Sequence, residues 1–420
     1  MPLTLAIPFF SISVFFIWLI HIVSTGFKTS IFHGFISPLS IIFYFTILYY
    51  IIGVPLFYLS TGLNFLNFDF TPFLAASYLL QFVFILFFSI PFFTLNYHKY
   101  KLHIPLKIEY RGISLAFCLF AFLVFLDLFF LYWGKTKINY YGITFGGRSE
   151  SHVLSTFGFL LPFVLLPFSI YFYMTKRFLG LLSLLIYISI TFPFGFRGIL
   201  FLPFLSVLLI EFLNDYDKKL KFFIPALLVI FCGICLYGLT RSYFNSPNFS
   251  NLEGIEGIDF LFGFFNDSNI VLTQSVLIYY LNSTSNFIGI NDYLISLKYF
   301  LNTDFTSSIV TSLDLINQTF SYYDFVFDAP TSGAAIPLTG SIYAMQGWLF
   351  FAIASSLLGF ISFSFWANIQ NGFLGRFLYL CLAPWFFNLN IRGYAPQAIA
   401  DFIFILSGII IVLLSIYKIK

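Results

Sequence analysis

Apolar residues fill long stretches of the chain, and short polar segments separate these stretches. The stretches are continuous, which excludes a membrane β-barrel, because barrel strands alternate between lipid-facing and interior residues. A run of 18 or more apolar residues is long enough for an α-helix to cross the hydrocarbon core of a membrane. The pattern predicts about eleven membrane-spanning helices, near residues 5–24, 36–60, 72–95, 112–133, 153–174, 178–193, 197–213, 222–240, 340–366, 374–389 and 397–417.

The composition supports the same fold class. Apolar residues make up 60% of the chain, charged residues only 9%, and the mean hydropathy is +0.94, whereas a soluble domain carries about 25% charged residues. We therefore expect an all-α, polytopic helical bundle in which residues 1–420 form a single membrane domain. The 65 phenylalanines are what an AT-rich genome supplies where any apolar residue suffices, so they do not indicate a cofactor pocket or a sugar-stacking platform.

Lysine and arginine predict the orientation, because they favour cytoplasmic loops. With the C-terminus in the cytoplasm and an odd number of spans, 13 of the 20 basic residues fall on the inside and the N-terminus lies outside. Four of the seven arginines fall outside, but only three of the thirteen lysines do. Chance in a small sample is one explanation. The other is that the outside arginines bind a planar anion, because guanidinium groups match phosphate with two parallel hydrogen bonds.

One long polar segment, residues 242–336, interrupts the spans on the outside. It carries nine acidic residues against the single Lys298, yet it also contains apolar and aromatic stretches such as 260–265 and 293–300. This mixture predicts short amphipathic helices on the membrane face and not a disordered linker. A loop of this length usually carries function.

The four outside arginines are the candidate anion-binding residues: Arg148, Arg197, Arg241 and Arg392. Arg148 follows two glycines that let a ligand approach the backbone, and it precedes the start of a span, where a helix N-terminus favours an anion. The others lie in short turns or at span ends. An arginine at a helix end is also a common membrane anchor. The four arginines on one face are therefore stronger evidence for anion binding than any one of them alone.

Two residues near Arg148, Glu150 and His152, are the candidate general bases. A neutral histidine suits removal of a proton from a sugar hydroxyl near neutral pH, although a histidine in this position is more often a helix-start residue than a base. Two carboxylates lie within spans, and Asp127 could pair with Lys135 or Arg148. Asp401 lies one helical turn after Gln397 and is expected to point toward Arg392, with Tyr394 nearby, so these three residues are expected to support the site.

Other chemistry is not indicated. The Cys-x-x-Cys at 232–235 lies within a predicted span without a second pair of ligands, so neither a metal site nor a redox site is expected there. No cofactor motif occurs. Basic residues are dispersed and the net charge is only +3, so nucleic acid is not an expected partner.

Four short motifs resemble the repeat-unit polymerases of bacterial O-antigen and capsule synthesis, the Wzy type. They are FGFRG at 194–198, TRSY at 240–243, PLTGSIYAMQGW at 337–348 and NIR at 390–392. In the third motif Gln346 stands where the family usually has phenylalanine. The resemblance covers about residues 140–400, and each of its motifs is short.

The resemblance implies a membrane glycosyltransferase of the bacterial inner membrane that acts on its periplasmic face. The outside arginines would hold undecaprenyl diphosphate, and the growing glycan would pass to a sugar hydroxyl of another lipid-linked repeat unit. Lipid-linked oligosaccharides, membrane lipid, a chain-length regulator and a flippase would be the partners. Arginines can stabilise a diphosphate leaving group without a metal, and the loop would cover the site and read the sugar.

Two alternatives remain open. An O-antigen ligase shares the carrier chemistry but transfers the glycan to a lipid A core. A flippase or other transporter of the same lipid would carry charges at mid-membrane and an even number of spans, with internal repeats. The repeat unit, its linkage and the stereochemical outcome are not encoded in any motif of the chain.

Overall fold

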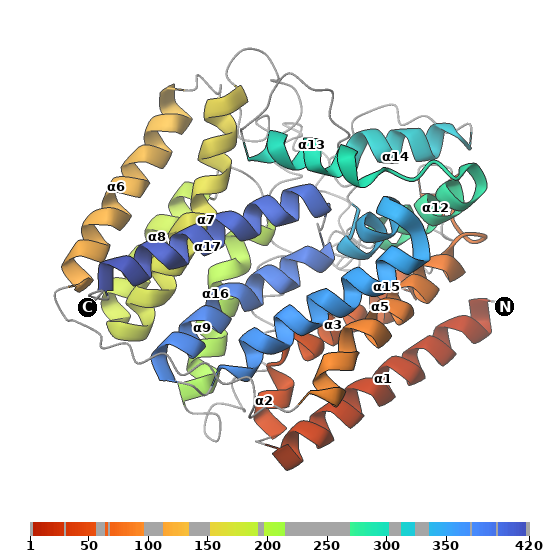
Figure 1. Ribbon diagram of the computed structural model, residues 1–420, viewed down its shortest axis with the longest axis horizontal. Helices are drawn as coiled ribbons and strands as arrows, with labels where there is room; N and C mark the ends of the chain where they lie inside the picture. Colours follow the sequence, from red (N-terminus) through yellow and green to blue (C-terminus); the bar gives the residue numbers. More distant parts are fainter. Residues whose placement is uncertain are drawn as a thin grey trace, which may run out of the picture.

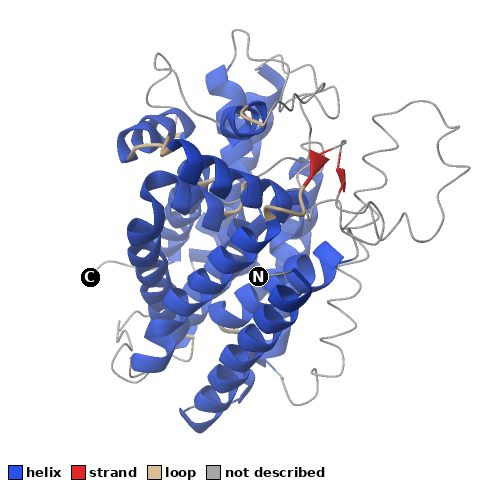
Figure 2. Ribbon diagram, turned by 90° about the vertical axis from the view of Figure 1, so that its right-hand side faces the viewer, coloured by secondary structure: helices blue, strands red, loops and turns tan. Residues whose placement is uncertain are grey.

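The structure is a computed structural model that describes residues 3–28, 31–55, 64–65, 68–95, 112–133, 152–191, 197–214, 269–301, 312–323, 336–369, 372–391 and 394–416. The described part is helical apart from one antiparallel pair of two-residue strands, β1 (Asn64–Phe65) and β2 (Phe68–Asp69). Figure 2 shows the strands at the edge of a bundle of long helices.

The helices of the first half follow the predicted apolar runs. They are α1 (Leu3–Lys28), the short α2 (Ile31–Phe35), α3 (Pro38–Thr46), the π-helix η1 (Ile47–Gly53), α5 (Leu74–Thr94), α6 (Gly112–Trp133), α7 (His152–Thr175), α8 (Arg177–Thr191) and α9 (Arg197–Asn214). The second half contains α12 (Asn269–Thr284), α13 (Ile290–Phe300), α14 (Ser312–Ser321), α15 (Leu338–Ala367), α16 (Gly372–Ile391) and α17 (Ala395–Ile416).

Ten of the eleven predicted spans coincide with apolar helices or helix pairs, and all but the second agree to within four residues at each end. Five helices among the described residues are long and apolar enough to cross a membrane: α1, α5, α6, α15 and α17. Shorter apolar helical segments match five other predicted spans. The predicted span 222–240 lies outside the described residues, so the count of eleven stays a prediction.

The helices alternate in direction, so the bundle has two ends (Figure 1). One end holds the last residues of α15 and α17: the Trp366 indole donates a hydrogen bond to the His33 carbonyl, and Gly112 at the start of α6 lies against Ile416. The opposite end holds the starts of α15 and α17, which the Ser341 hydroxyl joins by accepting from the Ala395 amide. We call these the inner and outer ends, following the predicted orientation.

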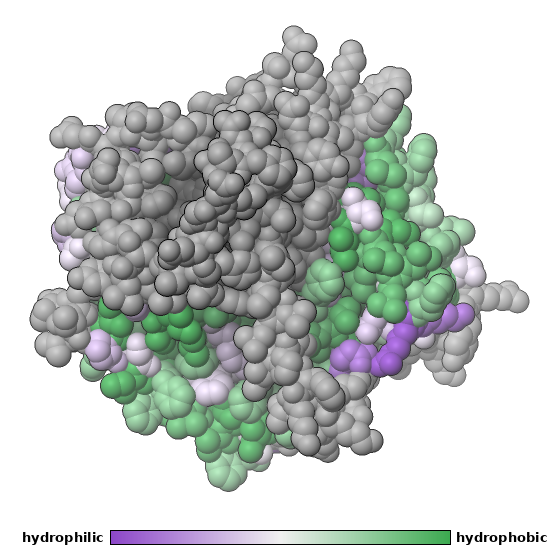
Figure 3. All heavy atoms as spheres, turned by 180° about the vertical axis from the view of Figure 1, so that it is seen from behind, coloured by the Kyte–Doolittle hydropathy of each residue, from purple (hydrophilic) through white to green (hydrophobic). Residues whose placement is uncertain are grey.

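The surface of the described helices has the character expected of a membrane protein. Large apolar side chains point outward along α1, α6 and α15, including Phe9, Phe125 and Leu349, which are 62, 64 and 77% exposed. Figure 3 shows extensive apolar surface on the described part of one face. Exposure of so much apolar area is unfavourable in water but not in lipid. These features define a helical, membrane-embedded protein.

Helices α5 and α15 pack closely against each other in the bundle core. A Cβ at Gly359 would collide with the backbone carbonyl of Phe88, so only glycine permits the two backbones to approach this closely. Phe84 and Phe351 extend the same contact and are fully buried. The contact fixes α15 against α5 along much of its length.

The segment predicted as an external loop contains α12, α13 and α14. The last two are short helices, each with buried and exposed faces. In contrast, α12 differs from the expected surface helix, because residues 270–278 are all buried and it packs against α5 and α15. This helix is therefore part of the bundle and not a cover on its surface.

Candidate functional site

The outer end of the bundle is covered by helices from the long segment. Figure 1 shows α13 and α14 crossing this end above the starts of α15 and α17. The contacts agree, since α13 packs against α17 and α15, and α14 packs against α12. The described helices therefore place a cover at the end where the outside arginines were predicted.

Ser341 joins three of these elements. The Tyr293 hydroxyl of α13 donates to the Ser341 carbonyl at 2.9 Å and lies 3.2 Å from its hydroxyl, which also accepts from the Ala395 amide at 2.8 Å. The Tyr293 ring lies 5.6 Å from the ring of Tyr394, centroid to centroid. Burial, with the neighbouring Tyr394, raises the pKa of Tyr293 above its ordinary value, which keeps this phenol a neutral hydrogen-bond donor.

Helix α15 is broken near the same end. Gln346 (φ −155°, ψ 23°) and Gly347 (φ 72°, ψ −154°) leave the helical region. The break frees carbonyl groups of the preceding turn, and the Ala344 carbonyl accepts from the Ile288 amide at 2.9 Å. A segment between α12 and α13 thus supplies a hydrogen bond that the helix itself does not make.

Two carboxylates lie buried within the helical bundle. Asp127 on α6 is 0% exposed and Asp401 on α17 is 4% exposed. Both oxygens of Asp127 and Oδ1 of Asp401 have no hydrogen-bond partner among the described residues. The fully buried Tyr187 of α8 lies within electrostatic reach of both carboxyl groups. A buried ionisable group inside a membrane bundle is costly, which makes it a candidate functional residue.

The predicted site residues divide into three groups. Arg148, Glu150, Arg241 and Arg392 lie outside the described residues. His152 is the first residue of α7 and Arg197 the first of α9, but the structure does not describe their side chains. Tyr394 and Asp401 are buried, and Gln397 is partly buried. The predicted convergence of the four arginines therefore stays a prediction.

Sequence reasoning did not single out Tyr293, Ser341 or Gly347 as site residues. Ser341 and Gly347 lie within the 337–348 motif, so the motif could have directed attention to them. A glycine directly after a glutamine inside a long apolar run was the available indication of the break. Tyr293 offered no such indication, because its role depends on contacts with residues 48 and 101 positions away.

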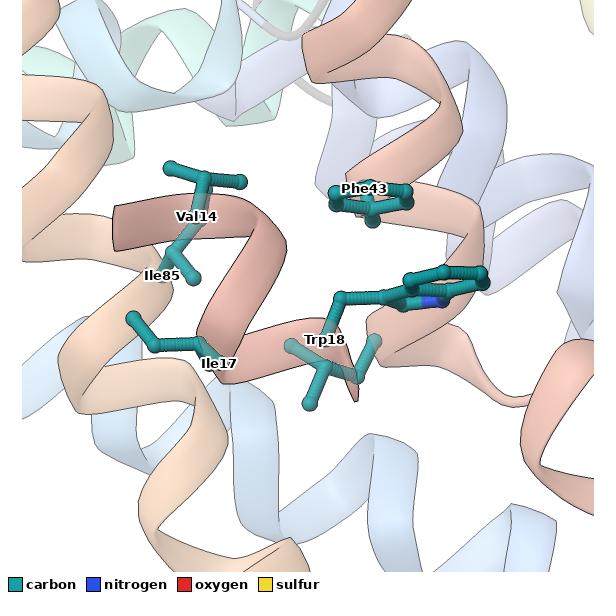
Figure 4. A pocket seen from close by; sticks show the side chains of 6 residues that line it. Val14, Ile17, Trp18, Phe43 and Ile85 are labelled. Atoms are coloured by element: carbon teal, nitrogen blue, oxygen red, sulfur yellow. The ribbon is translucent and has the colours of Figure 1, made fainter. Parts of the chain in front are cut away.

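The pocket shown in Figure 4 is apolar, and its lining includes none of the predicted site residues. Its lining comes from α1, α3 and α5 and includes Val14, Trp18, Phe43 and Ile85. The Trp18 indole is parallel to the Phe43 ring at 4.5 Å and donates to the Ser40 hydroxyl at 3.0 Å. The lining is apolar and offers no group for chemistry.

Within the described part of the chain, no three histidine, cysteine, aspartate or glutamate side chains lie together in a way that could hold a metal ion. The class of protein that the fold defines is a helical membrane protein with a covered outer end. No protein-family model matches the chain, and neither a curated protein nor a solved structure shows significant similarity to it.

Proposed function

We propose that the protein is a repeat-unit polymerase of a bacterial surface polysaccharide, O-antigen or capsule, acting at the outer face of the inner membrane. It transfers a growing glycan from undecaprenyl diphosphate to a sugar hydroxyl of a second lipid-linked repeat unit. One observation carries the proposal beyond the motif resemblance. Helices α13 and α14 cover the end of the bundle at which α9 begins with Arg197 and α17 begins just after Arg392.

The proposed mechanism needs stabilisation of charge and removal of a proton. Negative charge develops on the diphosphate as the glycosidic bond breaks, and Arg148, Arg197, Arg241 and Arg392 would stabilise it by paired hydrogen bonds. His152, with Glu150 beside it in sequence, would take the proton from the attacking hydroxyl. The cover would hold both lipid-linked substrates at the site and exclude water.

Arginine-to-lysine variants test the diphosphate clamp, because lysine keeps the charge but cannot bind phosphate with two parallel hydrogen bonds. We expect Arg197→Lys, Arg241→Lys and Arg392→Lys to reduce polymer in a gel banding assay by about tenfold or more, as for the loss of one charge-stabilising group. The matched control is Arg177→Lys at the inner end, whose side chain is 65% exposed and pairs with Glu211. This variant should make polymer of normal length.

Full-length polymer from all three outer variants would refute the clamp. Normal polymer from a His152→Ala variant would remove this residue as the base. Deletion of the chain separates the related functions as well: a polymerase leaves single repeat units at the surface, whereas a ligase leaves finished polymer on the carrier lipid.

A second candidate function is transport of the same lipid-linked oligosaccharide across the membrane. Buried Asp127 and Asp401 have oxygens without a partner among the described residues. They favour transport, because transporters use such groups in ion or proton pathways. The broken helix α15 is also a common transporter feature. Loss of transport leaves repeat units on the cytoplasmic leaflet, and Asp127→Asn and Asp401→Asn should then reproduce the deletion.

A further inference from the structure

A cluster of uncharged polar side chains lies buried at the outer end, apart from the predicted site residues. Four elements distant in sequence contribute to it: the π-helix η1 with the residue before it, α5, α12 and the start of α15. We call it the polar cluster, and its members are Thr46, Tyr50, Ser77, Gln81, Gln274 and Thr339. Each of them is at most 1% exposed.

Two hydrogen bonds order part of the cluster. The Gln81 Nε2 of α5 donates to the Thr46 hydroxyl at 3.0 Å, and the Thr339 hydroxyl donates to Gln274 Oε1 at 2.8 Å. Each bond joins residues that are at least 35 positions apart in sequence. The side chains are therefore held in place by bonds between helices.

The cluster leaves hydrogen-bonding atoms without partners among the described residues. They are the Tyr50 hydroxyl, Ser77 Oγ, Gln81 Oε1 and Gln274 Nε2, and all are buried. The Tyr50 hydroxyl lies within interacting range of Ser77, Gln274 and Thr339, but the geometry completes no full hydrogen bond with any of them. An unpaired buried polar group costs free energy, so a concentration of four at one place indicates that a ligand completes them.

The backbone around Tyr50 is also unusual. Tyr50 lies within η1, and the Tyr78 hydroxyl donates to the Tyr50 carbonyl at 2.7 Å. A π-helix is rare and is found frequently at functional sites, because the extra residue in the turn changes the direction of a side chain. Here it places a phenol among the polar groups of three other helices.

The chemistry of the four atoms indicates the class of ligand. Two hydroxyls can donate and accept, an amide oxygen accepts, and an amide nitrogen donates. None of the six side chains carries a charge, so the cluster does not complement a diphosphate. The matching ligand is uncharged and carries several hydroxyl groups. Such hydroxyl groups could come from a sugar or from bound water.

We propose that the polar cluster binds a sugar residue of the lipid-linked repeat unit, an inference that rests on the proposed function. The position of the polar cluster agrees with this proposal, since Ser77 and Thr339 lie in the first turns of α5 and α15, beside the covered outer end. Gln274 belongs to α12, which packs against α5 and α15. The long segment would thus read the sugar through a helix within the bundle.

Access to the cluster requires movement, because its unpartnered atoms are buried in the structure. The break at Gln346–Gly347 separates the first turns of α15, which carry Thr339, from the rest of the helix. A break of this kind can act as a hinge. Displacement of these turns, or of α12 beside them, opens the cluster to a ligand.

Binding of two lipids to the purified full-length protein in nanodiscs tests the proposal. The probes are bare undecaprenyl diphosphate and the lipid-linked repeat unit isolated from cells that lack this chain. We expect the wild-type protein to prefer the sugar-bearing lipid by about tenfold or more, as for one or two buried hydrogen bonds. Tyr50→Phe, Ser77→Ala and Gln274→Leu should lose this preference and bind the bare lipid unchanged.

Ser355→Ala is the matched control for Ser77→Ala. Ser355 is equally buried, but among the described residues its hydroxyl bonds to the Phe351 carbonyl of its own helix, so the sugar preference should persist. Unchanged preference in all three cluster variants would show that the cluster holds only water and would overturn the inference alone. If the wild-type protein binds neither lipid, the proposed function fails and this inference with it. Unchanged binding of bare lipid shows that each variant is folded.

Discussion

At the scale of single residues, Gly347 determines the shape of the longest described helix. Its φ of 72° with ψ of −154° lies in a region that residues with a Cβ avoid almost completely. The Phe287 ring lies beside it, and the nearby Ala344 carbonyl bonds outside the helix. This backbone conformation, which glycine can adopt, is therefore supported by contacts from another segment.

Replacement of Gly347 by alanine should destabilise the protein. The cost of holding a residue with a Cβ in this conformation is about 1–3 kcal/mol, which lowers the temperature of unfolding of the detergent-solubilised protein. Gly289→Ala serves as the control, because no backbone strain is present there and the nearest atom to a new Cβ lies 3.8 Å away. Equal unfolding temperatures for the two variants would show that the break is not strained.

At the scale of elements, Tyr293 attaches α13 to the bundle through Ser341. The Tyr293 hydroxyl reaches Ser341, and the Ser341 hydroxyl in turn satisfies the Ala395 amide at the start of α17. An amide in the first turn of a helix has no partner within its own helix. The serine therefore links the cover and two helices of the bundle at one point.

Removal of the Ser341 hydroxyl should loosen this end of the protein selectively. In Ser341→Ala the Ala395 amide loses its partner, at a cost of about 1–3 kcal/mol for a buried donor. Hydrogen–deuterium exchange should rise in α13 and in the first turn of α17. Ser362→Ala is the comparison, since within the described part of the chain the Ser362 hydroxyl bonds to the Leu358 carbonyl of the same helix. Unaltered exchange in α13 would mean that the apolar contacts of the cover suffice.

The helices were predictable from sequence, but the contacts between them were not. Continuous apolar runs determine where a helix must lie in lipid, and α6 begins and ends at the predicted residues. The residues before and after the break in α15 are both mostly apolar, so the whole run was predicted as one helix. The long polar segment was predicted to hold surface helices, but α12 is buried, with its Gln274 beside polar groups of η1 and α15.

The same limit applies to the site. Burial of Asp127 and Asp401 followed from their positions within spans, and the structure buries both. Their proposed arginine and lysine partners lie outside the described residues. The polar cluster could not be predicted, because nothing in the sequence near Tyr50 indicates Gln274. Only the fold brings these residues together.

At the scale of the whole molecule, most of the described charged residues other than the buried Asp127 and Asp401 lie near the two ends of the bundle. Lys28, Arg177 and Arg376 belong to helix ends at the inner side, where Arg177 and Glu211 form an ion pair at 2.7 Å. Asp292 and Lys298 belong to α13 at the outer side. The inner end is assigned to the cytoplasm from its basic residues, and this orientation stays a prediction.

Labelling with a membrane-impermeant maleimide tests the orientation. In a variant without the four native cysteines, Asn286→Cys should react in intact spheroplasts, because Asn286 is exposed in the outer segment between α12 and α13. Lys176→Cys, exposed between α7 and α8, should react only after permeabilisation. The opposite pattern would reverse the assigned ends and place the polar cluster on the cytoplasmic side.

The contact of Gly359 with the Phe88 carbonyl bears on how sequences with this fold can diverge. Positions that face lipid accept any apolar residue, so mutation can change them freely over time. Position 359 admits no atom beyond hydrogen, and position 347 needs a backbone conformation that side chains forbid. Distant relatives should therefore share two glycines twelve residues apart within one span, even where overall identity has disappeared.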